Sequence, residues 1–391
     1  MSEKMDGKQA VACNQAWRVA QKLSGAVLDA HENRVWSPAC VAYLLTVAVE
    51  GSAGQTRVEL DELLGGGSIL ESGKSPLALL ANRIATGSAG SRPDPFGLQV
   101  DADWCYENYE AHSSAALWLA KSASPKKTFL KACRHGGVKV AFCDFADPRT
   151  GQAVGEWICE QTRGLLSPEV QASPDALACL VGALYFKDAW AFPFDCCDTK
   201  NQIFHCLEGD IEVPFMHGVR SCQVAEADGS VAVSVLLSSG ARLLFALPRE
   251  GGTALHSMLT LLERLACDDA CWESVDINLP RFECETTVDD LVEPLVDAGV
   301  TTAPTMNLTS MVGDKSAFAQ IVHGARLAVD ENGVEAGAYT MMLIAPGCAA
   351  HMEEPPTPRV LVLDRPFIVA LVSRTGSPLF LGTVAHPLPA A

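Results

Sequence analysis

ENGVEAGAYTMMLIAPGCAA, residues 331–350, combines the alternation of a β-strand with the small residues of an exposed loop. Every second position from Val334 to Ile344 is apolar or small: Val334, Ala336, Ala338, Thr340, Met342 and Ile344. Period two is typical of a half-buried strand, yet the stretch starts with small residues and ends at Pro346-Gly347, as loops do. A segment that satisfies both patterns indicates a functional site, with a plain strand followed by a surface loop as the alternative.

Two strand-like runs flank this segment. Residues 317–330 precede it, and residues 361–372 follow it and pair with 378–384 in a closing hairpin around Thr375-Gly376. A connection longer than ~15 residues inside a compact domain is usually functional or disordered. We therefore expect the connection to carry the activity of the chain.

The rest of the chain predicts an α+β fold. Residues 8–31 have helical apolar spacing, and Ser37 with Pro38 predicts the start of a second helix that runs through Val49. Residues 176–186 are continuously apolar, as in a buried central strand. Helices lead and strands dominate later, with no repeat and no clear linker. We predict one domain over residues 1–391.

Composition excludes several classes of protein. The chain has 391 residues, 48% of them hydrophobic, which is ordinary globular composition rather than that of a disordered chain. With 47 acidic and 29 basic residues, the net charge of −18 argues against nucleic acid and anionic membrane surfaces as partners. The longest apolar run, residues 39–49, is too short to span a bilayer.

Known catalytic and metal-binding motifs are absent from this sequence or incomplete. Gly73-Lys74-Ser75 lacks the glycine that a phosphate loop needs, and no GxSxG or HExxH occurs. The fifteen cysteines include no CxxC pair, so we expect no metal and no cofactor. The first residues lack a secretory signal pattern, which predicts a cytoplasmic protein, or an extracellular one exported without a leader. Disulfides are then unexpected, and the cysteines are predicted to act as small buried hydrophobes.

Five segments, taken together and in order, resemble the serpin family. They are NRVWSP (33–38) with GSAGQT (51–56), LVGALYFKDAW (180–190) with Pro193-Phe194, LPRF (279–282), Val322-His323 leading to ENG (331–333) and EAGA (335–338), and DRPF (364–367) with LGTV (381–384) and Pro387. The resemblance covers residues ~10 to 387, nearly the whole chain.

The resemblance implies a single domain with three β-sheets, eight to nine helices and an exposed reactive-centre loop at about 331–363. It implies a monomeric suicide inhibitor of proteases, not an enzyme. A protease cleaves the loop, and the covalent acyl-enzyme is trapped when the loop inserts into the main sheet of a metastable protein. The hinge of the loop would comprise Glu331, Gly333, Val334, Glu335, Ala336, Gly337, Ala338, Tyr339 and Thr340. Glu335 and Tyr339 would face outward.

Counting along the usual hinge length of the family places the reactive bond at Gly347-Cys348. The bonds after Cys348 and after Met352 are the alternatives. Glycine fits a protease with a small or shallow primary pocket, such as an elastase- or subtilisin-like enzyme, whereas trypsin-like enzymes need a cation. Cys348 could also serve as an oxidation switch, although a passive small residue is the simpler interpretation.

The resemblance also implies a sheet-opening region formed by Ser37, Gly182, Trp190 and His323. Many members have asparagine where Gly182 stands, so we expect a reduced polar cluster with Ser37 and His323. Residues 77–110 lack the basic helix of heparin-dependent members, and no such cofactor is expected. Two further functions remain open: a non-inhibitory carrier or chaperone of the same fold, and an inhibitor of a cysteine protease.

Overall fold

The computed structural model describes residues 7–66, 110–170, 173–267, 272–288, 291–313, 319–334 and 357–387. These residues contain seven α-helices and a short 3-10 helix, where the resemblance implied eight to nine helices. The helices are α1 (Gly7–Val27), α2 (Pro38–Gly51), α3 (Gly54–Leu64), α5 (Lys127–Gly136), α6 (Arg149–Gln161), α7 (Leu255–Cys267) and α8 (Val292–Asp297), with the 3-10 helix at Ala303–Thr305.

Among the described residues, fifteen strands form two hydrogen-bonded sheets. A six-stranded sheet has the order β10-β11-β12-β4-β2-β3, and a nine-stranded sheet has the order β1-β15-β14-β8-β7-β6-β9-β13 with β5 paired to β6. The strands are β1 (Arg34–Trp36), β2 (Glu110–Ala120), β3 (Val138–Cys143), β4 (Ala178–Ala189), β5 (Lys200–Cys206), β6 (Gly209–Ala227), β7 (Ser230–Leu236), β8 (Arg242–Leu247), β9 (Trp272–Pro280), β10 (Phe282–Val288), β11 (Ala319–Val329), β12 (Gly333–Val334), β13 (Arg359–Val362), β14 (Phe367–Val372) and β15 (Pro378–Val384).

Three separate sheets were expected, and the difference lies in β6. This strand is 19 residues long and pairs in turn with β5, β9 and β7. One long strand therefore joins three ladders, with β5, β9 and β7, into a single sheet. The prediction of one strand over 361–372 was also wrong. Pro366 interrupts it, and β13 and β14 pair with different neighbours.

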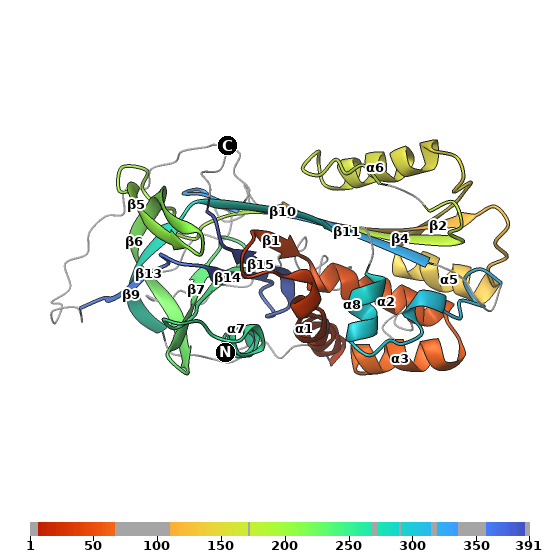
Figure 1. The fold of residues 1–391 in the computed structure, drawn as a ribbon, viewed down its shortest axis with the longest axis horizontal. Helices are drawn as coiled ribbons and strands as arrows, with labels where there is room; N and C mark the ends of the chain where they lie inside the picture. The colour runs from red at the N-terminus through yellow and green to blue at the C-terminus, as the bar shows by residue number, and fades with distance from the viewer. Residues whose placement is uncertain are drawn as a thin grey trace.

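Helices cover both faces of the six-stranded sheet. Figure 1 shows α6 on one face and α2, α3 and α5 on the other. The face toward α2 belongs to the main hydrophobic core, which continues into the nine-stranded sheet. The face toward α6 closes a smaller cluster that includes Trp157, Val181 and Ala183. The residues of β4 from Ala178 to Phe186 are therefore buried on whichever face they lie.

Local sequence explains how α2 reaches the centre of the fold. The Ser37 side chain accepts a hydrogen bond from the Cys40 amide at 3.2 Å, and Pro38 occupies the first turn, as predicted. Nearly every residue of α2 is buried, because the helix packs on α1, α3, β4 and β15. The closing hairpin of β14 and β15 around residues 375–376 is likewise confirmed.

Candidate functional site

The segment predicted as the hinge begins with a tight turn after β11. The Asp330 carboxylate accepts hydrogen bonds from the amides of Asn332 at 2.8 Å and Gly333 at 3.2 Å, and the Asp330 amide donates to the Gly333 carbonyl at 3.1 Å. An aspartate that bonds to the backbone two and three residues on is a standard way to reverse the chain. The turn sends residues 333–334 back alongside the strand they came from.

These two residues form β12, which lies between β11 and β4. Val334 pairs with Val329 on one side and with Asp188 on the other, both antiparallel. Its side chain is only 2% exposed and joins the main core. The beginning of the hinge is thus already a strand of the six-stranded sheet.

Below β12, the two flanking strands pair directly only over part of their length. β4 and β11 are parallel, and their ladder runs from Ala319 opposite Ala178 to His323 opposite Gly182. Between that ladder and β12, residues 183–187 and 324–328 have no ladder partner across this boundary among the described residues. Among the described residues, β4 and β11 therefore form no ladder with each other over the stretch next to Val334.

Gly333 fits only because it has no side chain. A Cβ atom there would collide with the carbonyl oxygen of Asp188 and lie 2.7 Å from Cα of Ala189, and its φ of +154° is rare for other residues. The glycine of the hinge is therefore required by the close approach of β12 to β4.

We expect Gly333→Ala to displace β12 and to lower the free energy of unfolding by about 1–3 kcal/mol. Gly25→Ala is the matched control, because Gly25 lies within α1 with nothing within 4 Å of its Cβ position. That change should stabilise α1 by up to ~1 kcal/mol. Urea unfolding measures both, and an equal response of the two variants would contradict this account of the hinge.

The Glu331 carboxylate ties this turn to two other segments. It is 4% exposed, and its carboxylate accepts hydrogen bonds from Arg281 Nε at 2.9 Å and from Thr199 Oγ1 at 2.6 Å. Burial by itself would raise the pKa of Glu331, but these hydrogen bonds and the Arg281 charge outweigh it, and the pKa is lowered. Glu331 is therefore a paired, ionised anchor.

Trp190 holds the same turn from the other side. Its indole Nε1 donates to the Asp330 carbonyl at 2.7 Å, and its amide donates to the Asn332 carbonyl at 3.0 Å. The ring is 2% exposed and stands edge-on to Phe194. Trp190, predicted from the sequence as part of the sheet-opening region, lies directly against the hinge.

Asp188 is a buried carboxylate opposite Val334 that the sequence analysis did not single out. It is 2% exposed. Its carboxylate accepts hydrogen bonds from the Ser238 hydroxyl, from the Ser239 hydroxyl at 2.6 Å and from the Ser239 amide at 3.1 Å. Both serines are in the turn after β7. Burial raises its pKa to about 6, although these hydrogen bonds oppose the rise. No cation is paired with it in the part of the chain that the structure describes.

Ser37 and His323 meet beneath the end of the β4–β11 ladder. The Ser37 amide donates to His323 Nε2 at 2.9 Å, so the neutral ring carries its proton on Nδ1. Nδ1 is buried and has no hydrogen-bond partner among the described residues. Gly182 lies opposite His323, and a Cβ atom there would collide with the Cys40 thiol. The polar cluster is thus a single hydrogen bond, and α2 occupies the space that a side chain at 182 would need.

Burial lowers the pKa of His323 to about 4. In the unfolded chain a histidine titrates near ~6.5, so between these pH values the unfolded state binds more protons than the folded state. Acidification through this window should therefore lower the free energy of unfolding, by ~1.4 kcal/mol per pH unit. Urea unfolding of the wild type and His323→Asn from pH 7 to pH 4 measures this contribution. Parallel pH profiles of the two proteins would show that His323 does not cause it.

The structure brings together Glu331, Gly333, Val334 and Trp190 at the hinge, and Ser37, Gly182 and His323 one ladder below. The remaining predicted residues, 335–340 and the bond Gly347-Cys348, lie outside the described residues, and their roles stay predictions. Arg281, Thr199 and Asp188 were missed. Arg281 stands in the LPRF segment that carries the resemblance, so that segment was the available signal.

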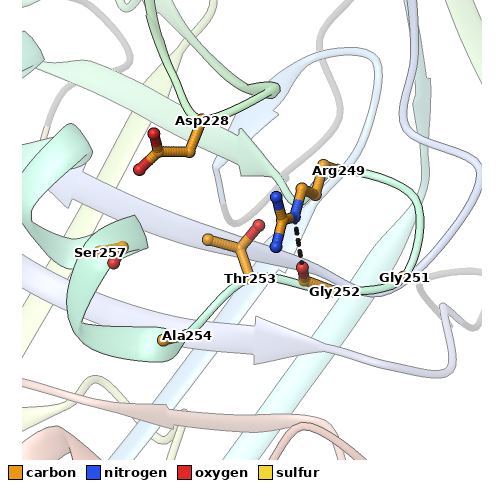
Figure 2. Close-up of a pocket in the computed structure, with 7 residues that line it drawn as sticks. All are labelled: Asp228, Arg249, Gly251, Gly252, Thr253, Ala254 and Ser257. Carbon is orange, nitrogen blue, oxygen red and sulfur yellow. Dashed lines mark hydrogen bonds between the residues drawn. The ribbon is translucent and has the colours of Figure 1, made fainter.

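A second hollow lies away from the hinge, at the start of α7. This pocket of about 660 Å³ is lined by residues that include Asp228, Arg249 and Thr253. Figure 2 shows the Arg249 guanidinium directed toward the Gly252 carbonyl. Arg249 Nε donates to the Gly252 carbonyl at 3.2 Å, and the hydroxyls of Thr253 and Ser230 are 2.7 Å apart. Its polar groups hold the loop together, so we assign it no chemistry.

Two features are absent from the described residues, a cluster of metal ligands and a helix that could span a membrane. No group of three or more histidine, cysteine or acidic side chains there could hold a metal ion. No helix described in the structure is both long and apolar enough to cross a membrane.

Comparison with known proteins gives one family. Residues 11–387 match the family model described as Serpin (serine protease inhibitor). A serpin-like protein of Thermococcus kodakarensis is 28% identical over 384 residues, covering 91% of this chain and 81% of that protein. A serine protease inhibitor of Cyanea capillata is 25% identical over 380 residues, covering 92% and 94%.

Solved structures share the fold. The thermophilic serpin tengpin in its native state has a TM-score of 0.78 at 20% identity, covering 99% of this chain and 96% of that one. Thyroxine-binding globulin in complex with thyroxine has a TM-score of 0.73 at 21% identity, covering 97% and 99%. At these identities the likeness establishes the α+β architecture and leaves the activity open.

Proposed function

The chain belongs to the serpin (serine protease inhibitor) family, which is a family of inhibitors rather than of enzymes although it includes non-inhibitory members, and on this premise we propose that it traps a serine endopeptidase covalently. The protease would cleave the loop beyond Val334, and the freed segment would insert between β4 and β11 as a new central strand. The protein would act as a monomer and without a cofactor. The observation that carries this proposal is β12, which already lies between the two strands.

The spacing of the strands supports insertion. Val334 lies opposite Asp188 on β4 and opposite Val329 on β11. Continuing both ladders residue by residue brings Ile344 opposite Ala178 and Ala319, where the β4–β11 ladder begins. The alternating stretch that ends at Ile344 therefore has the length that the two strands require.

The two faces of the sheet match the alternation of the loop. In the continued ladder, positions 336, 338 and 342 oppose Phe186, Leu184 and Leu180, which belong to the main core. Their residues are alanine, alanine and methionine, with no charge to be desolvated. The uncharged face of the loop would thus be the one that enters the core.

The two residues expected to face outward, Glu335 and Tyr339, would have different surroundings in the continued ladder. Tyr339 would oppose Ala183, which is 2% exposed and lies in the cluster under α6. Glu335 would oppose Lys187, which is half-buried. Insertion therefore exposes Glu335 to water and to a cation, whereas Tyr339 must pass beneath α6.

The target class follows from the loop sequence. No lysine or arginine occurs between Arg326 and Arg359. Arg359 begins β13, pairs with Val275 of β9 and forms ion pairs with Glu226 and, at 3.8 Å, Glu273. A protease that needs a cation would find none in the loop, which favours a target with a small or shallow pocket acting at Gly347-Cys348.

Incubation with a panel of proteases tests this proposal. We expect complexes stable in sodium dodecyl sulfate with an elastase- or subtilisin-like enzyme and none with trypsin, because trypsin has no cation to bind in the loop. Mass spectrometry of the released carboxy-terminal peptide should place the cut at Gly347-Cys348. Cleavage after Arg359 as the inhibitory event would overturn the assignment, and cleavage without any stable complex would favour a non-inhibitory carrier.

A further inference from the structure

The described part of the chain contains twelve free cysteines, eight of them buried. Two of the twelve meet although they lie about 250 residues apart in the sequence. Cys13 is on α1 and is 1% exposed, whereas Cys267 is the last residue of α7 and is exposed. Their side chains are hydrogen-bonded to each other. A buried thiol and an exposed thiol in direct contact are a candidate redox site.

Independent contacts fix the two helices at this point. Two turns further along α1, Gln21 Nε2 donates to Glu263 Oε2 at 3.2 Å, and Glu263 is one turn before Cys267 on α7. Residues four apart share a helix face, so the same faces of α1 and α7 meet at both places. Between them, Trp17 Nε1 donates to the Gly376 carbonyl at 2.8 Å.

Both sulfur atoms also lie against the turn between β14 and β15. Cys13 Sγ donates to the Thr375 carbonyl at 3.8 Å, and a Cβ atom on Gly376 would lie 3.7 Å from Cys267 Sγ. Arg242 holds the end of α7 in place, because its guanidinium donates to the carbonyls of Leu265 at 3.3 Å and Ala266 at 2.5 Å. The contact between the thiols thus rests on anchored elements on both sides.

We propose that Cys13 and Cys267 form a reversible disulfide that joins α1 to the end of α7. The oxidant is a low-molecular-weight disulfide. Cys267 loses a proton to water, and its thiolate attacks one sulfur of the small disulfide. That sulfur stays on Cys267 as a mixed disulfide, the original S–S bond breaks, and the other sulfur leaves as a thiolate that takes up a proton. Cys13 then loses its proton and attacks the Cys267 sulfur, releasing the second thiol. Two protein thiols are oxidised and one small disulfide is reduced to two thiols.

Exposure sets the order of these steps. A small disulfide can reach Cys267, which is exposed, whereas Cys13 is buried. The hydrogen bond with Cys267, burial and the Glu263 charge all raise the pKa of the Cys13 thiol, so it stays protonated while the pair is reduced. Cys267 is therefore the residue that reacts with the oxidant, and Cys13 is the residue that resolves the mixed disulfide.

Peptide mapping of the full chain tests the proposal. The protein is equilibrated with oxidised glutathione, quenched with acid, alkylated and digested without reduction. We expect one cross-linked peptide pair that contains residues 13 and 267. The thermal midpoint should rise by several degrees, because the cross-link closes a loop of about 250 residues in the unfolded chain, and dithiothreitol should reverse the rise.

Three variants separate the roles. Cys267→Ser should remove both the cross-link and the rise in midpoint, whereas Cys13→Ser should trap glutathione on Cys267. Cys284→Ser is the matched control, because Cys284 is 1% exposed and its Sγ also donates to a backbone carbonyl, that of Thr383 at 3.7 Å. It should leave the cross-link intact. A cross-link from Cys267 to Cys271, or Cys13 still open to alkylation in the oxidised wild type, would overturn the proposal.

Discussion

Val334→Glu is expected to turn the inhibitor into a substrate, with the number of protein molecules consumed per protease inhibited rising ~tenfold or more. Val334 must stay in the core while the strand behind it inserts, and a glutamate there would be buried against Asp188. Burying an unpaired charge costs several kcal/mol, and ~1.4 kcal/mol on a barrier slows a step tenfold. Slower insertion lets the acyl-enzyme hydrolyse and the protease escape. Titration of the target protease measures the change.

The uncleaved protein should tolerate the same change better. In that state β12 can leave the sheet and carry the carboxylate into water, so the loss is limited to the burial of one valine, roughly 1.5–3 kcal/mol. The cleaved protein has no such escape, because residues behind position 334 can enter only if 334 stays in place. The substitution therefore acts mainly on trapping, and the rate of loop cleavage should be unchanged.

A rearranged variant supplies the control. Val334→Glu combined with Glu335→Val keeps the composition of the loop and moves one carboxylate from the outward to the inward face. It should lose inhibition as fully as the single variant, whereas Glu335→Val alone should inhibit normally. Equal inhibition by the rearranged variant and the wild type would mean that the alternation from Val334 to Ile344 does not define the inserting face.

Asp188 changes the choice of residue for this test. From the sequence alone, Val334→Arg is the natural way to introduce a buried charge. In the structure an arginine there would face the Asp188 carboxylate and could form an ion pair. We therefore expect Arg to be less damaging than Glu, and the difference to vanish in an Asp188→Asn background.

The case of Asp188 shows where reasoning from sequence ends. The alternation after Val334, the cap at Ser37 and the closing hairpin are local patterns, so they could be predicted, and the structure confirms the last two. The serines that hold Asp188 are about 50 residues away, in the turn between β7 and β8 of the other sheet. Nothing in the local sequence predicts such a contact, because tertiary packing decides it.

The same limit applies to Arg281 and to the paired cysteines. Arg281 could be recognised as part of a shared segment, but its partner Glu331 is 50 residues further on. Cys13 and Cys267 are on different helices, and spacing along the chain carries no information about their contact. Conversely, the expectation of three sheets failed because the length of β6, which joins the ladders, cannot be read from short apolar runs.

Cleavage of the loop between Thr340 and Met352 is expected to raise the thermal midpoint by on the order of 10 °C or more. The freed segment would gain ladder partners on both sides over the ten positions from 335 to 344, continuing the pairing of Val334 with Asp188 and Val329. Met342 and Ile344 would each add roughly 1.5–3 kcal/mol by burial. Calorimetry before and after limited proteolysis measures the change.

The site beneath the ladder favours the inserted state as well. In the continued ladder Thr340 falls between Gly182 and His323, on the face toward α2. Its hydroxyl could accept a hydrogen bond from the Nδ1–H of His323, which has no partner among the described residues. An unsatisfied buried donor costs ~1–3 kcal/mol, so insertion would relieve a cost present before cleavage. Cleaved Val334→Glu, in which insertion is slowed, should show a delayed rise. If the cleaved wild type also melts at or below the midpoint of the intact protein, the strand does not insert, and the fold serves a function other than trapping.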